Sequence, residues 1–387
     1  MARVGIIGTG WGARVQVPAF REAGLDVIAI AGHNSERTRK IAGEFDVEPF
    51  DDWRTLVASN VDLVTIVTPP SEHLQMASSA LDAGKHVLCE KPTALNASEA
   101  EQLLATARKH REQIALIDHE LRFLPSFRAA RERIGDLGGI RYAEVRYASP
   151  GRGDRTRAWN WWSDANQGGG IWGAVGSHFV DALRFLGMEI EAVQATLRTI
   201  IDERPFENGS RRVTSDDFAD VALRLANGAI ASMTFSAVAS GPDEPTTLTI
   251  HGEEGAMRLA GEDLLTAMRG EPFTAATKGS RSDRRGNSAG GAFGTGTYFL
   301  GRALKSAIDD GDRDALANAA TFDDGLAQQR VLDAARESNA QGGGWVNLSF
   351  RAARATSARP PDSRRPASIP RVEQGDPHGL ARVAPPL

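Results

Sequence analysis

The sequence predicts an α/β protein in which an N-terminal doubly wound sheet is followed by an α+β domain with a large, mostly antiparallel sheet. Three observations predict this fold class. Short apolar runs alternate with helical segments over the first 117 residues, as in a parallel sheet that is covered on both faces. A G-x-G-x-x-A turn closes the first apolar run. From about residue 123 the pattern changes to apolar and alternating runs joined by hairpin signals such as Asn227-Gly228.

The turn after the first strand, residues 4–7, has the composition of a dinucleotide-binding turn. Such a site needs a glycine for the tight turn, a glycine where a side chain would block the pyrophosphate, and a small residue where helix packs on strand. The next helix then presents free N–H groups to the phosphates. Glycine-rich turns also occur with a purely structural role, but the position directly after a strand favours a Rossmann domain. We therefore assign the turn to the cofactor, through Gly8, Thr9, Gly10, Trp11 and Gly12.

The other elements of this domain follow in order. Further strands are expected at residues 27–31, 61–67, 86–89 and 114–117, and helices at residues 15–23, 36–45, 73–83 and 98–109. Ligands of such sheets bind beyond the carboxyl ends of the strands. Those ends hold Thr68 and Pro69, with His73 just after them, and Glu90 and Lys91. We expect all five to bind the cofactor, and Lys91 to bind the substrate as well.

The rest of the chain predicts a second domain and a tail. Hairpins are expected at residues 217–236 and 248–259, helices at 298–309 and 323–339, and a basic, Gly- and Ser-rich loop at 278–297. Residues 351–387 hold seven arginines and seven prolines, which predicts an extended or disordered arm, or a strap onto a partner subunit. The expected domains are residues 1–122, 123–350 and the tail 351–387.

Composition limits the possible functions. The 387 residues are 41% hydrophobic and 25% charged, with a net charge of −5, so nonspecific nucleic-acid binding is not expected. No apolar run is long enough to span a bilayer, and the first residues lack the order of a signal peptide, so we expect a cytoplasmic protein without membrane contact. The single cysteine, Cys89, excludes an internal disulfide and a cysteine-built zinc site. No metal site is expected.

Several motifs together resemble the Gfo/Idh/MocA family of nicotinamide-dependent sugar and cyclitol oxidoreductases over about residues 3–350. They are Gly5 to Gly10, Thr68-Pro69-Pro70 with His73, Glu90-Lys91-Pro92, Leu121 to Pro125, Gly168-Gly169-Gly170, Gly176-Ser177-His178, Asp216 to Ala219 and Thr321 to Gly325. The resemblance implies a nicotinamide cofactor, a small sugar-like substrate and a homo-oligomer, either dimer or tetramer, formed through the second domain.

Lys91 and His178 are the expected catalytic residues. A lysine beside a hydroxyl stabilises a developing alkoxide, and a histidine exchanges a proton near neutral pH. In the family an aspartate stands four residues before the histidine, but this chain has Ala174 there. Asp181, three residues after His178, either replaces that carboxylate or has a capping or packing role.

Substrate binding is expected from side chains at the domain junction. Trp161 and Trp162 either stack on a sugar ring or belong to the core or a dimer contact. His119 and Arg122 follow the last strand of the first domain and can line the cleft, as can His178 and Asp181.

The cofactor preference is expected at the end of the second strand. An acid there binds the ribose hydroxyls of NAD, but this chain has Gly32-His33-Asn34-Ser35, with Arg37 close behind. We therefore expect NAD(P), with NADP favoured. Trp11 resembles the family's apolar residue beside the nicotinamide.

The expected activity is oxidation or reduction of a hydroxyl or keto group of a sugar, cyclitol or glycoside. Three alternatives stay open, the first two of them because of Ala174. They are transient oxidation with a recycled nicotinamide during glycoside cleavage or epimerisation, a nucleotide-sensing regulatory protein without catalysis, and a biliverdin-reductase-like activity.

Overall fold

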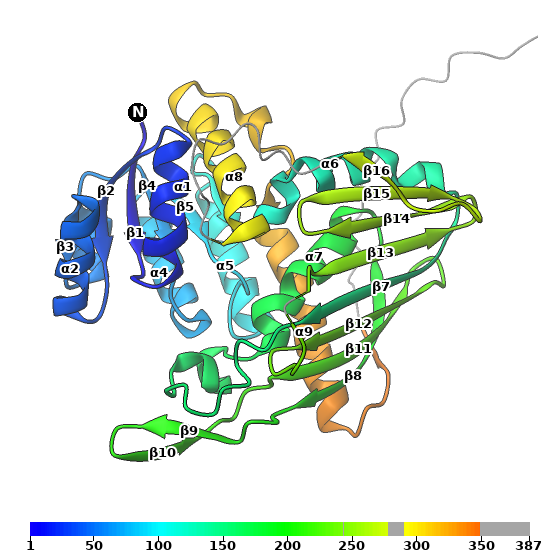
Figure 1. Ribbon diagram of the computed structural model, residues 1–387. Helices are drawn as coiled ribbons and strands as arrows, with labels where there is room; N and C mark the ends of the chain where they lie inside the picture. The colour runs from blue at the N-terminus through cyan, green and yellow to red at the C-terminus, as the bar shows by residue number, and fades with distance from the viewer. Residues whose placement is uncertain (243, 278–289, 349–387) are drawn as a thin grey trace, which may run out of the picture. The chain divides into compact units, whose positions relative to one another are not determined.

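The computed structural model describes residues 1–242, 244–277 and 290–348 (Figure 1). Met1–Ser349 form one compact unit that contains a parallel and a mostly antiparallel sheet, which confirms the predicted fold class. The predicted arm at 351–387 and residues 278–289 of the predicted loop lie outside the described residues.

The first sheet is doubly wound. Its strand order is β17-β6-β5-β4-β1-β2-β3, and every pairing is parallel except that of β17 with β6. The chain moves outward from β1 in both directions, so the order reverses between β1 and β4, where such sheets bind their ligands. The strands are β1 (Arg3–Ile7), β2 (Asp26–Ala31), β3 (Glu48–Phe50), β4 (Leu63–Ile66), β5 (His86–Cys89), β6 (Ala115–Ile117) and β17 (Ala320–Thr321).

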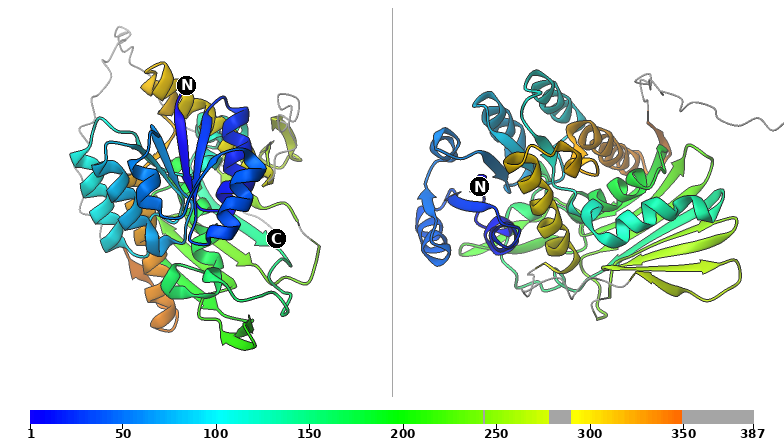
Figure 2. Two further views of the ribbon diagram at one scale, coloured as in Figure 1. Left: turned by 90° about the vertical axis from the view of Figure 1, so that its left-hand side faces the viewer. Right: turned by 90° about the horizontal axis from the view of Figure 1, so that it is seen from above.

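Helices cover both faces of this sheet (Figure 2). One face packs against α1, α2 and α8, through residues such as Phe20 and Leu304. The other face packs against α3, α4, α5 and the first turns of α9, through residues such as Leu81 and Leu103. The bounds are α1 (Val17–Glu22), α2 (Ser35–Phe45), α3 (Trp53–Ala58), α4 (His73–Asp82), α5 (Ala97–Lys109), α8 (Gly291–Asp309) and α9 (Phe322–Ala340).

The second sheet has nine strands in the order β16-β15-β14-β13-β7-β12-β11-β8-β18. Its pairings are antiparallel except for β7 with β12. The hairpins predicted at 217–236 and 248–259 are confirmed, as β11–β12 and β13–β14. The strands are β7 (Ile140–Ala148), β8 (Ile190–Arg198), β11 (Phe218–Leu225), β12 (Ile230–Ser236), β13 (Thr247–Gly252), β14 (Gly255–Ala260), β15 (Asp263–Met268), β16 (Thr274–Thr277) and β18 (Val346–Asn347), and a separate hairpin contains β9 (Glu203–Phe206) and β10 (Gly209–Arg212).

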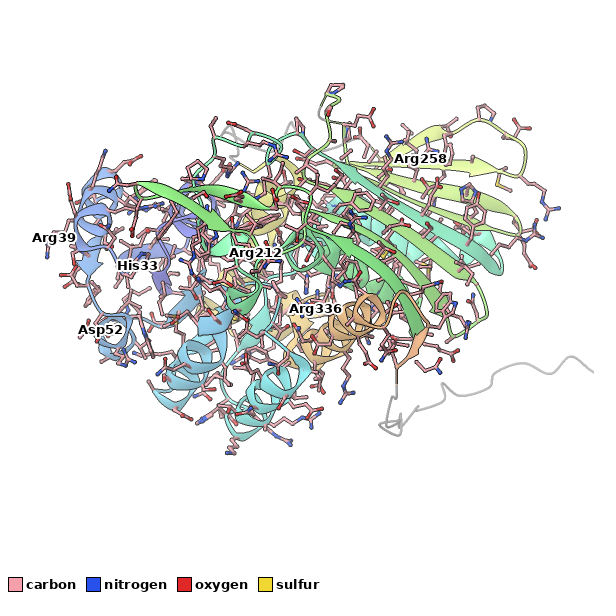
Figure 3. All side chains as sticks on the ribbon, turned by 90° about the horizontal axis from the view of Figure 1, so that it is seen from below. His33, Arg39, Asp52, Arg212, Arg258 and Arg336 are labelled. Atoms are coloured by element: carbon pink, nitrogen blue, oxygen red, sulfur yellow. The ribbon has the colours of Figure 1, made fainter. Side chains whose placement is uncertain are left out.

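One face of the second sheet is covered and the other is open. Helices α6 (Pro125–Arg133), α7 (Ser177–Phe185) and α9 lie on the covered face (Figure 1). Trp172 and Phe235 are fully buried in the core between them and the sheet. The open face carries Tyr142, which is 46% exposed, and Arg258 (Figure 3). The strands therefore alternate between apolar and polar residues, as a half-buried sheet requires.

Helix α8 differs from the prediction, because it begins at Gly291 and so converts the end of the predicted loop into helix. Its glycines are explained by close packing. A Cβ on Gly296 would collide with the carbonyl oxygen of Glu120, and a Cβ on Gly301 would lie 2.9 Å from the Phe20 ring. Gly is a poor helix former in isolation, but here tertiary contacts require it.

Helix α9 belongs to both hydrophobic cores. Phe322 and Leu326 pack in the core of the first sheet, while Val331 and Leu332 pack in the core of the second. The preceding strand, β17, joins the edge of the first sheet. This shared helix fixes the two sheets relative to one another.

We expect the two sheets to unfold together. Phe322→Ala and Leu332→Ala each delete a buried side chain from a different core, so each should lower the free energy of unfolding by about 2–5 kcal/mol. Urea unfolding followed by circular dichroism and tryptophan fluorescence should give one coincident transition. The exposed Glu337 on the same helix supplies the control, since Glu337→Ala should change the stability by less than about 0.5 kcal/mol. Two separated transitions would contradict a shared core.

Candidate active site

The turn after β1 is shaped for a phosphate group. Gly8 has a φ of +135°, and a Cβ there would collide with the Val67 carbonyl, so this position requires glycine. A Cβ on Gly10 would have no heavy atom within 4 Å, which leaves open space beside the turn. A five-residue π-helix, Gly12–Gln16, then leads into α1. The glycines and the helix start thus fit the pyrophosphate of a dinucleotide.

The end of β2 forms the neighbouring part of the predicted cofactor site. Asn34 caps α2 by accepting a hydrogen bond of 2.9 Å from the Arg37 N–H. The Arg37 guanidinium donates to the carbonyl oxygen of Thr9 at 3.0 Å. A Cβ on Gly32 would lie 2.7 Å from Thr9 and Thr38 atoms, and His33 is exposed at the start of α2 (Figure 3). The helix start, His33 and Arg37 therefore border one patch next to the phosphate turn.

His73 joins the loops that follow β4 and β5. Its two ring nitrogens lie 3.0 Å from the carbonyl oxygens of Pro92 and Thr68. The ring is fully buried, and this burial lowers the pKa of His73 to about 4. The neutral ring carries one N–H and donates it to one of these two carbonyl oxygens, so His73 links the loops that hold Thr68 and Pro92.

Lys91 connects the end of β5 to the second domain. Its ammonium group donates a hydrogen bond of 2.7 Å to the carbonyl oxygen of Ala174. Ala174 lies in a second π-helix, Trp172–Gly176, which leads directly into α7. Since His178 is one turn further along the same helical segment, this bond brings the two expected catalytic residues to one site.

Carboxyl groups gather beside Lys91. Gln16, from the first π-helix, donates to Asp118 at 2.9 Å and to Glu90 at 3.4 Å. Burial raises the pKa of both carboxyl groups. Proximity to the Lys91 ammonium acts in the opposite direction on both. The site therefore combines the Lys91 ammonium with two buried carboxyl groups of raised pKa.

His178 is buried and faces a carboxyl group that the sequence did not single out. Its Nδ1 atom lies 3.7 Å from Oε2 of Glu120, and both side chains are less than 5% exposed. Burial, and then the charges of Lys91 and His119, hold the pKa of His178 well below its usual range. Glu120 follows β6 as Asp118 and His119 do, so its position at a strand end was the signal that could have identified it.

Arg122 and Asp181 form a buried ion pair. The guanidinium donates two hydrogen bonds, of 2.8 and 2.6 Å, to the two carboxylate oxygens. Arg122 also lies 3.2 Å from Asp324. The Asp181 carboxylate thus binds Arg122, and the carboxyl group beside His178 is that of Glu120. The pair ties the segment after β6 to α7.

His119 lies next to this ion pair. Its Nδ1 atom is 3.9 Å from Asp181, and its Nε2 atom is 2.8 Å from the amide nitrogen of Gln328, which also donates to the Ser177 carbonyl. Burial lowers the pKa of His119 to about 4. The neutral ring accepts the Gln328 hydrogen bond through Nε2, and it stands 5.8 Å from the His178 ring, centre to centre.

The loop that carries Trp161 and Trp162 packs against the first domain through Gly168 and its neighbour Gly169. A Cβ on Gly168 would lie 2.6 Å from Pro70, and one on Gly169 would collide with the Trp162 carbonyl. Trp162 is half-buried, with the Arg152 guanidinium 3.4 Å above its ring. Trp161 is 37% exposed. Of the two rings, Trp161 keeps the more accessible surface.

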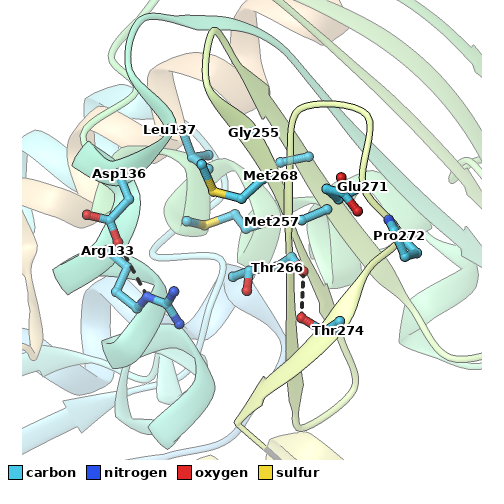
Figure 4. Close-up of a pocket in the computed structure, with 12 residues that line it drawn as sticks. Arg133, Asp136, Leu137, Gly255, Met257, Thr266, Met268, Glu271, Pro272 and Thr274 are labelled. Atoms are coloured by element: carbon cyan, nitrogen blue, oxygen red, sulfur yellow. Dashed lines mark hydrogen bonds and ion pairs between the residues drawn. The ribbon is translucent and has the colours of Figure 1, made fainter.

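A separate pocket of about 300 Å³ lies between α6 and strands β14 to β16 (Figure 4). Arg133, Leu137, Met257 and Met268 are among its lining residues. It contains none of the residues that the sequence predicts for the site. Within the described ranges, no group of three or more His, Cys, Asp or Glu residues could hold a metal ion, and no helix there is long and apolar enough to cross a membrane.

Known proteins resemble this chain over most of its length. Residues 2–117 match the model of an oxidoreductase family with an NAD-binding Rossmann fold, and residues 127–258 match the GFO/IDH/MocA C-terminal domain. An uncharacterized oxidoreductase of Synechocystis is 34% identical, with 69% of this chain and 74% of that protein aligned. Glucose-fructose oxidoreductase domain-containing protein 2 of Xenopus laevis is 32% identical, with 90% and 94% aligned.

Two solved structures share the fold. Levoglucosan dehydrogenase, in complex with NADH and L-sorbose, superposes with a TM-score of 0.80 at 25% identity and covers 90% of this chain and 99% of its own. An inositol dehydrogenase homolog from Azotobacter vinelandii, in complex with NADH and myo-inositol, has a TM-score of 0.73 at 22% identity, with 90% and 97% covered.

Alanine substitutions at Gly8 and Gly10 should have different effects, one on stability and the other on NADH binding. Gly8→Ala should destabilise the fold by about 1–3 kcal/mol, because of its positive φ and the Val67 carbonyl. Gly10→Ala should leave the stability unchanged but weaken NADH binding by at least about tenfold, because the added methyl enters the pyrophosphate space. Thermal unfolding and NADH titration measure the two effects. Equal NADH affinity of Gly10→Ala and the unaltered protein would contradict this location of the phosphates.

Proposed function

The chain belongs to the GFO/IDH/MocA oxidoreductase family and carries its NAD-binding Rossmann fold, and we propose that it oxidises or reduces a hydroxyl or keto group of a sugar, cyclitol or glycoside. Lys91 stabilises the alkoxide in this proposal, and His178 moves the proton. The observation that carries it is the hydrogen bond from Lys91 to Ala174, one helical turn before His178.

When bound, the nicotinamide exchanges a hydride with the carbinol carbon. The protein supplies the remaining chemistry. The Lys91 ammonium donates to the substrate oxygen and stabilises the negative charge that develops there. Neutral His178 accepts the hydroxyl proton during oxidation and returns it during reduction. Its lowered pKa keeps the imidazole neutral at pH 7, so it begins oxidation as a base.

The substrate class is supported by the likeness to levoglucosan dehydrogenase, whose structure contains L-sorbose. Trp161, which is 37% exposed, offers an aromatic face on which the C–H surface of a sugar ring can stack. We further propose a cytoplasmic homo-oligomer. The open face of the second sheet supports it, since Tyr142 stacks on His251 with ring centres 4.3 Å apart and Ile230 is 41% exposed.

Replacing the two catalytic residues should separate binding from turnover. His178→Ala and Lys91→Ala should each lower kcat by about 10²- to 10⁴-fold, because each loses proton transfer or alkoxide stabilisation. NADH binding, measured by tryptophan fluorescence, should stay within about threefold of the unaltered protein. A panel of sugars, inositols and glycosides supplies the substrates.

Other outcomes of that panel favour the alternatives. Tight coenzyme binding with no turnover of any compound would favour a regulatory protein. Products that appear without net reduction of the coenzyme would favour a recycled nicotinamide. Full activity of both variants would contradict the catalytic assignment.

We also propose a preference for NADP, through Arg37 and His33. Arg37→Ala should weaken NADPH binding by about tenfold, because a charge-assisted hydrogen bond to the 2′-phosphate is lost, and should leave NADH binding unchanged. Arg39, on the same helix, supplies the control because it pairs with Asp51 at 2.9 Å. Arg39→Ala should leave both affinities unchanged. Tighter binding of NADH than of NADPH by the unaltered protein would contradict the preference.

A further inference from the structure

Glu120 occupies a fixed position beside His178. It begins the short helical segment Glu120–Phe123, directly after β6. A Cβ on Gly296 would lie 3.0 Å from the Cγ atom of Glu120 and would collide with its carbonyl oxygen, so α8 packs tightly against this residue. The carboxyl group is therefore held in the site by tertiary packing.

The two facing atoms have no other partner among the described residues. Oε2 of Glu120 and Nδ1 of His178 are both buried without a hydrogen bond, and they lie 3.7 Å apart. This separation exceeds a normal hydrogen bond by about 0.7 Å. Hydrogen bonds between catalytic groups are often long without substrate and shorten in the complex.

The neighbouring acids are already engaged. Asp118 accepts a hydrogen bond from Gln16, and Asp181 binds Arg122. His119, the other polar ring near His178, uses its Nε2 atom for Gln328. Among the described residues, Glu120 is the carboxyl group that lies within 4 Å of His178 Nδ1.

We propose that Glu120 is the positioning and proton-accepting partner of His178, and that it replaces the carboxylate missing at Ala174. The inference rests on the proposed function, since it assigns a second proton site to the same reaction. Glu120 acts through His178 and does not touch the substrate.

The proton balance of the step is complete. During oxidation the hydroxyl proton moves to Nε2 of His178, while the proton on Nδ1 moves to the Glu120 carboxylate. The hydride, with two electrons, leaves the carbinol carbon for the coenzyme. Reduction reverses each transfer. The pair thus gains one proton in oxidation and returns it in reduction.

The electrostatic surroundings support this role. Burial, and then the charges of Asp118 and Glu90, hold the pKa of Glu120 well above its usual range, while Lys91 acts in the opposite direction. A carboxyl group with a raised pKa is a better proton acceptor than an ordinary glutamate. The charged or titratable groups that act on the pKa values of Glu120 and His178 are Lys91, Glu90, Asp118 and His119.

Nitrogen NMR of the protein without coenzyme tests whether Glu120 controls which ring nitrogen of His178 carries the proton. Below the pKa of Glu120 the carboxylic acid donates to Nδ1, so His178 carries its proton on Nε2. As the pH rises through that pKa, the carboxylate accepts instead and the imidazole proton moves to Nδ1. Histidine-labelled protein should show this tautomer change at the resonance that disappears in His178→Gln.

The matched variants are Glu120→Gln, which keeps the shape of the side chain, and Asp118→Asn, which alters a neighbouring acid. Glu120→Gln should abolish the pH-dependent tautomer change, and Asp118→Asn should retain it. The same tautomer change in Glu120→Gln and in the unaltered protein would overturn the proposal. This experiment needs no substrate, so it decides the Glu120 proposal even if the proposed enzymatic function fails.

Kinetics with an active substrate give a second test. Glu120→Gln should lower kcat by about 10²-fold or more and remove one limb of its pH profile. Adding Ala174→Asp should restore at least tenfold of the lost activity, because it returns a carboxylate one turn before His178. A double variant as inactive as Glu120→Gln, with an unchanged pH profile in both, would contradict the role of Glu120.

Discussion

The hydrogen bond from the Lys91 ammonium to the Ala174 carbonyl joins the two halves of the site. Lys91 stands at the end of β5, in the loop held by His73, and Ala174 belongs to the π-helix that leads into α7. Helix α9 packs into the hydrophobic cores of both sheets, and so links the two sheets that carry these residues.

Burial of charge sets the chemistry of the cleft. Lys91 is close to Glu90, Asp118 and Glu120, and desolvation favours the protonated form of all three acids. The same desolvation keeps His178 neutral. A neutral imidazole beside a carboxylate suits reversible proton transfer, because the raised pKa of Glu120 makes that carboxylate a better proton acceptor than an ordinary glutamate. In our proposal, Glu120 supplies the carboxyl group that is missing at Ala174.

The sequence predicted the first domain better than the second, for physical reasons. Strands buried on both faces form continuous apolar runs, so β1, β2, β4 and β5 were found within a few residues. Strands β7 and β8 alternate with charged residues because one face is open, and they were not recognised. Asp181 was considered for His178 because it is near in sequence, whereas its carboxylate binds Arg122. The pairing of Glu120 with His178 joins distant segments and follows from tertiary packing alone.

A crystal structure with reduced coenzyme and a sugar-like ligand tests the central claim most directly. We predict a ligand hydroxyl or carbonyl oxygen within hydrogen-bond distance of both Lys91 Nζ and His178 Nε2, with the carbinol carbon facing the nicotinamide. A ligand bound away from both residues, while the coenzyme occupies the Gly8 to Gly12 turn, would contradict the assignment of this cleft as the catalytic site.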